Sequence, residues 1–208
     1  MLTNAVPSSS TGAAPVAARP APTRGWKNCG ETLVAALFLF ACLAVFFWEP
    51  FATGGTLLPV ANIFVQPFYR PYAPVEFSGA PNLLLADLSS HLYPLQHFAF
   101  NALRAGSLPL WNPHIMLGSP VLGTAQTAPL YPLHWLLAVL PPLAVFVARP
   151  LFNLWIAGVS TYLLVRHLGA RASAALLSAL AFMFSGFLIV WLGYALTNAA
   201  VWLPLLIL

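Results

Sequence analysis

Charge is scarce in this sequence: Asp, Glu, Lys and Arg together make up 6% of its 208 residues, whereas hydrophobic residues make up 60%. A soluble domain usually has about 25% charged residues, so this chain lacks the groups needed to cover a water-exposed surface. The composition therefore predicts a protein embedded in a lipid bilayer. The formal net charge of +4 comes from scattered basic residues, which are typical of membrane topology signals and do not indicate a nucleic-acid-binding patch.

Cysteine is almost as scarce as charge. Cys29 and Cys42 lie at the start of and inside the first apolar segment, and no cysteine follows them. No disulfide is therefore expected in the long loop between the apolar segments. Neither cysteine lies near other residues that could bind a metal with it. A Gly-rich phosphate loop, a His/Cys metal cluster and a Ser-His-Asp arrangement are also missing, so the sequence predicts no metal site.

Long apolar runs are what the sequence does have, and a membrane span needs about 20 such residues. A basic-then-apolar start is also typical of a signal peptide, but the first run is long and lacks a clear small-x-small cleavage site, which favours an uncleaved span. The last run is cut short, so we interpret the chain as the N-terminal part of a larger protein. The spans are predicted at about 32–48, 150–165 and 172–192, with an incomplete one from about 198.

The regions around these runs set the predicted organisation. Residues 1–28 lack periodicity and predict a disordered tail, and residues 29–208 form part of a polytopic membrane domain. Three prolines interrupt the apolar stretch 129–148, so it is either a kinked span or an interfacial segment. The basic clusters at 19–27 and 166–171 favour the second arrangement by the positive-inside rule. The predicted topology then has a cytoplasmic N-terminus and an outer loop over 50–148.

The sequence of the outer loop predicts one amphipathic helix. Pro94 suits its first position, Arg104 suits its last turn, and Gly106 can end it. Its polar face would carry Gln96, His97 and Asn101, and the helix is suited to lie on the membrane surface. The apolar face follows helical spacing: Leu95, Phe98, Ala99, Ala102 and Leu103.

Several blocks of this region are similar to one known family. Asp87 with Tyr93-Pro94, and the segments 104–113, 118–120 and 126–132, resemble the bacterial YfhO-type membrane proteins. The resemblance covers about residues 80–208, and the most specific block is Gly-Ser-Leu-Pro-Leu-Trp-Asn-Pro at 106–113. It implies an all-α, polytopic fold like that of GT-C glycosyltransferases, which take sugar from a polyprenyl-phosphate-linked donor. Their first outer loop carries an acidic catalytic residue, and Asp87 matches that position.

The sequence also differs from the family pattern in one respect. Many GT-C enzymes have two neighbouring acidic residues, whereas here Glu76 lies eleven residues before Asp87. A divalent metal cofactor is therefore not supported. Asp87 is the candidate general base, because a partly desolvated carboxylate becomes a better base near neutral pH. A helix-capping aspartate is the alternative interpretation.

Each candidate substrate-binding residue also has an alternative interpretation in which its role is only structural. His91 would orient the carboxylate or bind diphosphate, or it is an interfacial histidine. Arg104 would pair with a lipid phosphate, or it complements the helix dipole. Trp111 would stack on a sugar or belong to an aromatic belt, and Asn112 is a turn residue or a ligand. Gln126 either meets substrate or caps a helix.

Two functions follow as hypotheses. The first is a glycosyltransferase of the bacterial inner membrane that modifies an envelope glycan or polymer on the outer side. The alternative is a transporter or an assembly factor for envelope polymers. Transporters place ionisable residues within their spans, and the predicted spans carry none, which favours the enzyme.

Overall fold

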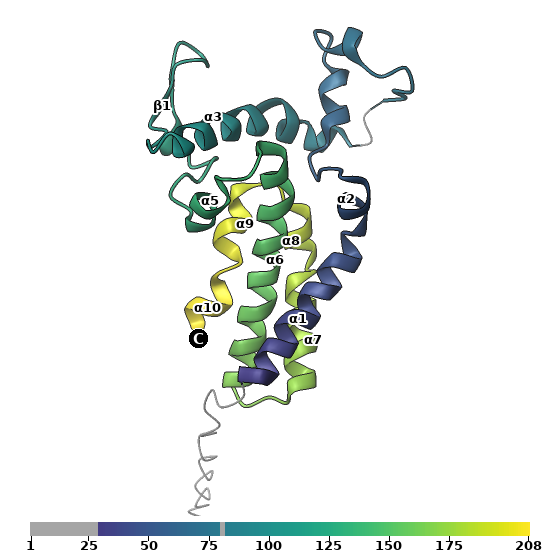
Figure 1. Ribbon diagram of the computed structural model, residues 1–208, viewed down its shortest axis with the longest axis vertical. Coiled ribbons are helices and arrows are strands. Elements are labelled where there is room, and N and C mark those ends of the chain that lie inside the picture. Colours follow the sequence, from purple (N-terminus) through teal and green to yellow (C-terminus); the bar gives the residue numbers. More distant parts are fainter. Residues whose placement is uncertain (1–28, 80–81) are drawn as a thin grey trace, which may run out of the picture.

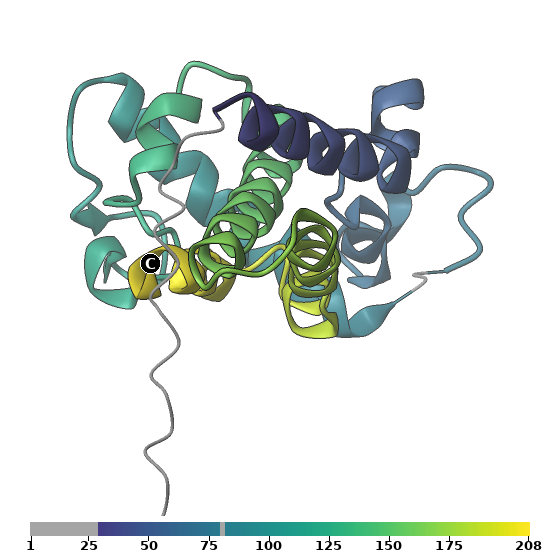
Figure 2. The same cartoon turned by 90° about the horizontal axis from the view of Figure 1, so that it is seen from below.

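The computed structural model describes residues 29–79 and 82–208, and the described part is mostly helical. Three of its helical segments are long and apolar enough to cross a membrane: α1 (Cys29–Phe46), α6 (Pro142–His167) and the segment Ala172–Val190. The last of these consists of α7 (Ala172–Met183) and α8 (Gly186–Val190). The helices suggest a multi-pass membrane protein, as the composition predicted. They run side by side, with α6 next to both α1 and α7 (Figures 1 and 2).

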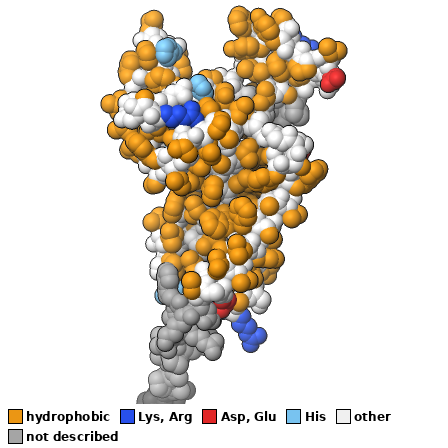
Figure 3. Space-filling model, viewed as in Figure 1, with side chains coloured by type: hydrophobic (Ala, Val, Ile, Leu, Met, Phe, Trp, Pro, Cys, Tyr) orange, Lys and Arg blue, Asp and Glu red, His pale blue; other side chains and the backbone are white. Residues whose placement is uncertain are grey.

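Small residues let these helices approach closely. Gly158 of α6 faces Met183 and Leu39, because a Cβ atom at Gly158 would lie 2.9 Å from Met183 Sδ and 3.4 Å from Leu39 Cδ1. The Trp155 indole N–H also donates to the Ala36 carbonyl at 2.9 Å, which ties α6 to α1. Figure 3 shows hydrophobic side chains over the visible face of the bundle and charged side chains near its two ends. This distribution suits a bundle surrounded by lipid.

The long helix α6 begins before the predicted span at 150. It starts at Pro142, which lies in the first turn, and continues through Pro150 to His167. Proline is tolerated in a first turn because that N–H has no partner within the helix, whereas an interior proline removes one hydrogen bond. Helix α6 packs on α5, α7 and α10, and Pro150 is among its buried residues. The stretch 129–148 is therefore divided between the short helix α5 (Pro132–Leu137) and the first turns of α6.

The segments between α1 and α6 form a separate layer at one end of the bundle (Figure 1). Its strands pair as a short antiparallel hairpin, with Trp111 opposite Pro120 and Asn112 opposite Ser119. Beyond α8 the chain returns along α6 through α9 (Ala195–Ala200) and α10 (Leu203–Ile207). The remaining elements of the layer are α2 (Trp48–Thr53), η1 (Val60–Val65), η2 (Arg70–Tyr72), η3 (Leu83–Leu85), the π-helical η4 (Leu88–Leu92), α3 (Tyr93–Arg104), β1 (Trp111–Asn112), β2 (Ser119–Pro120) and α4 (Val121–Thr124).

The amphipathic helix predicted after Pro94 is present as α3. Its apolar positions Leu95, Ala99 and Leu103 are buried, which confirms the helical spacing. The placement of Gln96 on the polar face was wrong, because its side chain is 1% exposed. The reason is that α3 is covered on two sides, by Val121 next to Leu95 and by the hydrophobic cluster of α5 and α6 next to Leu103.

The other end of the bundle carries an ion pair that the sequence did not reveal. Arg166, near the end of α6, lies 3.0 Å from the Glu31 carboxylate at the start of α1. The Tyr162 hydroxyl donates to the same carboxylate at 2.7 Å. The start of α1 and the loop 166–171 therefore lie at one end, and the layer of 47–141 lies at the other. Which end faces the cytoplasm stays a prediction, and the tail predicted for 1–28 lies outside the described residues.

Candidate functional site

Asp87 lies at the start of the π-helical turn η4, in the layer outside the bundle, and its side chain is exposed. Its carboxylate makes no capping hydrogen bond to η4. The hydroxyls of Ser89 and Ser90 instead donate to the Ala86 carbonyl, at 3.1 and 2.9 Å. The capping alternative is thus not realised in this structure, and the carboxylate is accessible.

A turn from the far end of the chain passes beside Asp87. Burial is the main cause that raises the pKa of the Tyr194 hydroxyl, and the negative charge of Asp87 raises it further. The neighbouring Gly193 lies against Leu88, because a Cβ atom there would be 2.7 and 2.9 Å from the Leu88 methyl carbons. The absence of a side chain at Gly193 therefore lets this turn approach η4 and brings Tyr194 near Asp87.

Two predicted substrate-binding residues meet in the same layer. His91 Nε2 lies 3.0 Å from Gln126 Oε1, and both side chains are exposed. Because an amide oxygen accepts, this bond uses the tautomer with a proton on Nε2. The sequence had placed both residues in the site without predicting that they contact each other.

The hairpin residues have defined local roles. Asn112 is buried, and its Oδ1 accepts from the His114 backbone N–H at 2.9 Å, as expected of a turn residue. Trp111 is 56% exposed and covers Gly118, where a Cβ atom would lie 2.4 Å from the indole ring. Gly118 also has φ +115°, a conformation that favours glycine. Sugar binding by Trp111 and Asn112 stays a prediction.

Arg104 uses its guanidinium to hold α3 against the segment that follows α5. Its Nε donates to the Ala138 carbonyl at 2.6 Å, and its Nη2 donates to the Leu140 carbonyl. Its Nη1 donates to Asn101 Oδ1 at 3.2 Å. All three nitrogen atoms thus have partners within the layer, and a contact of Arg104 with lipid phosphate stays a prediction.

The structure also contains a buried polar cluster that sequence reasoning missed. It lies where the first turns of α6 meet α5, α9 and α10. The signal available was an arginine four residues before an asparagine, which places both on one helix face. That signal was lost because the helix was predicted to start only at residue 150. The members of this cluster, called the Arg149 cluster below, are Tyr131, His134, Arg149, Asn153, Asn198 and Trp202.

Hydrogen bonds connect most of the Arg149 cluster. The Tyr131 hydroxyl donates to Asn153 Oδ1 at 2.6 Å and accepts from the Trp202 indole N–H at 3.1 Å. Asn153 Nδ2 in turn donates to Asn198 Oδ1 at 2.8 Å. The chain of bonds links α6 to α9 and to the segment before α5, and it fixes the relative positions of these elements.

Arg149 is the charged member of the cluster and is 0% exposed. Its Nη2 donates to the Gly193 carbonyl at 2.8 Å, and its guanidinium lies 5.5 Å from the centre of the Phe146 ring. Its Nε and Nη1 have no hydrogen-bond partner among the described residues. The ion pair found in the described chain joins Arg166 to Glu31 and leaves Arg149 without a carboxylate. A buried cation of this kind is costly and marks a functional site by default.

Arg149 also affects the ionisable groups around it. Burial, with a smaller contribution from Arg149, lowers the pKa of His134 to about 3, so the ring is neutral at pH 7. Burial raises the pKa of the Tyr131 hydroxyl, although the bond from Trp202 and the charge of Arg149 oppose the rise. Neither group therefore supplies a negative charge to Arg149.

One premise of the functional prediction is corrected by this cluster. The spans were expected to carry no ionisable residue, but α6 is a candidate span and contains Arg149 in its interior. The error followed from the predicted start of the helix, which left Arg149 in the outer loop. The absence of ionisable residues from the predicted spans favoured an enzyme over a transporter, and the buried Arg149 weakens that preference.

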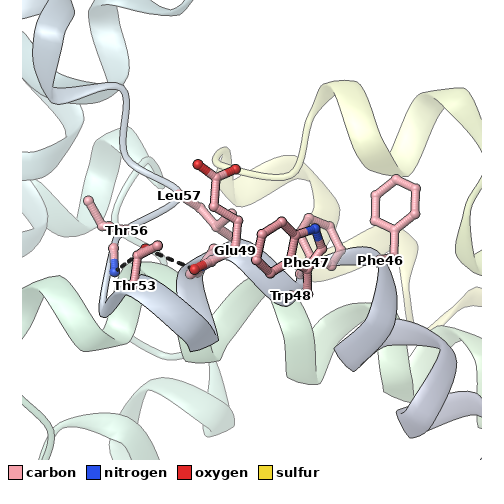
Figure 4. A pocket seen from close by; sticks show the side chains of 9 residues that line it. Phe46, Phe47, Trp48, Glu49, Thr53, Thr56 and Leu57 are labelled. Carbon is pink, nitrogen blue, oxygen red and sulfur yellow. Dashed lines mark hydrogen bonds between the residues drawn. The ribbon is translucent and has the colours of Figure 1, made fainter.

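A small pocket lies at the end of α1 that leads into the layer of 47–141. It encloses about 240 Å³ and is lined by residues of 46–57, with Glu49 beside the rings of Phe47 and Trp48 (Figure 4). The Thr53 hydroxyl donates to the backbone carbonyl of Glu49 at 2.8 Å, so this bond does not involve the Glu49 carboxylate. None of the predicted site residues lines this pocket.

In the described residues, no group of three His, Cys, Asp or Glu side chains is placed to hold a metal ion. No family model matches this chain, and neither a curated protein nor a solved structure matches it.

Proposed function

We propose that this chain is part of a membrane glycosyltransferase that takes sugar from a polyprenyl-phosphate-linked donor. The acceptor is an envelope glycan or polymer on the outer side of the bacterial inner membrane. The N-terminus lies in the cytoplasm, so the layer of 47–141 faces outward. The resemblance of residues 80–208 to YfhO-type proteins motivates the proposal.

The observation that carries the proposal is the position of Asp87. The carboxylate is exposed at the end of the bundle, makes no capping bond, and lies near Tyr194. Glycosyl transfer needs a base that removes the proton of an acceptor hydroxyl, and an accessible carboxylate can take it. His91, four residues after Asp87 on η4, and its partner Gln126 add a donor and an acceptor for sugar hydroxyls.

The proposal is tested by Asp87→Asn in the full-length protein, with glycan modification of the envelope as the measurement. The substitution keeps the shape and removes the proton acceptor, so we expect the rate to fall by about 10²- to 10⁴-fold. Glu76→Gln is the matched control, because Glu76 is also an exposed carboxylate of the outer layer. Normal modification by Asp87→Asn at matched protein level would exclude the catalytic role.

Arg149 favours a second candidate, a transporter or an assembly factor for envelope polymers. Intramembrane ionisable residues mark substrate pathways in transporters, and Arg149 is buried within α6. This alternative predicts that Asp87→Asn leaves the movement of polymer or precursor across the membrane unchanged, while Arg149→Gln abolishes it. The glycosyltransferase predicts instead that Asp87→Asn abolishes sugar transfer.

A further inference from the structure

We propose that the Arg149 cluster binds the phosphate group of a phosphate monoester, between the first turns of α6 and the start of α9. The proposal does not rest on the role of Asp87. It concerns a second position, separated from Asp87 by the turn at 193–194. On one side of that turn the Gly193 carbonyl accepts a hydrogen bond from Arg149. On the other side the charge of Asp87 contributes to the raised pKa of Tyr194.

Three buried donors of the Arg149 cluster have no partner in the described part of the chain. They are the N–H donors Arg149 Nε, Arg149 Nη1 and Asn198 Nδ2. Unpaired buried donors are rare, and each costs about 1–3 kcal/mol. The guanidinium adds a positive charge, and its planar fork matches two oxygen atoms of one oxyanion. These groups therefore fit an oxyanion.

His134 narrows the choice among oxyanions. Its Nδ1 lies 2.9 Å from the Ala128 carbonyl and must donate, because a carbonyl only accepts. The neutral ring then leaves Nε2 as an acceptor, and this atom also has no partner. The unpaired groups of the Arg149 cluster are thus three N–H donors and one acceptor, and His134 is close enough to Arg149 for that charge to affect it. A protonated phosphate monoester satisfies both kinds of group, because it has acceptor oxygens and one P–O–H donor.

Other oxyanions satisfy the site less well. A phosphate diester and an ionised carboxylate have only acceptor oxygens, so either would leave His134 Nε2 unpaired. A buried acceptor without a partner reduces affinity by about 5- to 150-fold. Preference for a monoester over a diester is therefore the distinguishing property of the proposed site.

The depth of the site suits a ligand at the membrane surface. Arg149 lies seven residues after Pro142, which is about 10 Å along the helix at 1.5 Å per residue. Arg149 is thus in the first turns of α6, at the end of the helix that follows the layer of 47–141, and α5 packs against this helix. A phosphate here can come from a lipid headgroup or from a soluble phosphate, and the chemistry of recognition is the same.

The test measures binding by titration calorimetry at pH 6, with the full-length protein in non-ionic detergent. The second pKa of a phosphate monoester is about 6, so both protonation states are populated. The probes are short-chain phosphatidic acid, a monoester, and short-chain phosphatidylglycerol, a diester. We expect phosphatidic acid to bind about 10-fold or more tightly than phosphatidylglycerol. Inorganic phosphate is the soluble probe: saturable binding of phosphatidic acid alone assigns the site to a lipid, and binding of both assigns it to the phosphate group itself.

Variants locate the binding. Arg149→Gln is expected to weaken phosphatidic acid binding by about 10- to 100-fold, whereas His134→Phe keeps binding and removes the preference for the monoester. Arg171→Gln is the matched control, since Arg171 is exposed at the opposite end of the bundle. Equal affinity of the wild type for the two lipids, no binding of any probe, or unchanged binding by Arg149→Gln would each overturn the proposal. The comparison of lipids needs no variant and stands even if Arg149→Gln fails to fold.

Discussion

Replacing Gly193 with alanine tests how the far end of the chain is joined to the candidate catalytic turn. The added methyl would lie 2.7 and 2.9 Å from the two Leu88 methyl carbons, well inside ordinary contact. Leu88 is 5% exposed, so its side chain has little room to move. Gly193 is not among the residues with positive φ, so alanine adds no backbone strain. The effect is therefore steric.

Overpacking of this kind costs about 1–3 kcal/mol in the free energy of unfolding. The measurement is denaturation in mixed micelles, in which increasing SDS unfolds the protein. We expect Gly193→Ala to lower the free energy of unfolding by that amount. Gly186→Ala is the matched control, because a Cβ atom at Gly186 meets nothing within 4 Å. That control should be neutral or stabilising by up to about 1 kcal/mol, since alanine favours the helix.

A double variant separates the steric cause from a general loss of stability. Leu88→Ala alone removes a buried side chain and should cost about 2–5 kcal/mol. In Gly193→Ala/Leu88→Ala the new methyl occupies part of the vacated space. The double variant should therefore be at least about 1 kcal/mol more stable than the sum of the single effects. Strict additivity, or a Gly193→Ala variant as stable as the wild type, would refute the packing argument.

Two further predictions concern topology and pH. In a cysteine-free background, Ser107→Cys should react with a membrane-impermeant thiol reagent in whole cells, whereas Ser173→Cys should react only after lysis; the reverse pattern would overturn the orientation. For His134, the folded pKa of about 3 lies below the ordinary 6.5, so the unfolded chain binds the proton between these values. Its contribution to stability is complete above pH 6.5 and falls towards pH 3, at up to about 1.4 kcal/mol per pH unit. His134→Phe should lose this component of the pH dependence, and an unchanged profile would show that His134 is not buried in the neutral form.

Helix α3, in the layer of 47–141, shows what hydrophobic periodicity can predict and what it cannot. The spacing of Leu95, Ala99 and Leu103 predicted one buried face of α3, and that face is buried. The same pattern misplaced Gln96, because periodicity describes one helix and contains no information on how many neighbours cover it. The second cover comes from α5 and α6, which follow α3 by dozens of residues.

The candidate site also combines a residue that the sequence predicted with contacts that the sequence did not predict. Asp87 was selected from the sequence, but the contact between His91 and Gln126 and the approach of Tyr194 depend on packing across the layer. The Arg149 cluster was missed because Pro132, Pro141 and Pro142 argued against a continuous helix before residue 150. Helix-breaking residues act locally, and contacts with neighbouring helices outweigh their cost of about 3 kcal/mol.

The sequence by itself determined a composition suited to a bilayer and the approximate positions of three long apolar helices, but not the first turns of α6. Hydrophobic length and charge content are properties of consecutive residues, and lipid acts on each segment separately. Only the tertiary structure decided that Arg149 is buried, and that Gly193 joins it to the turn beneath Asp87. Those contacts join residues far apart in the chain. They exist only after the helices have packed, because burial removes water and makes each polar group depend on the partner that the fold supplies.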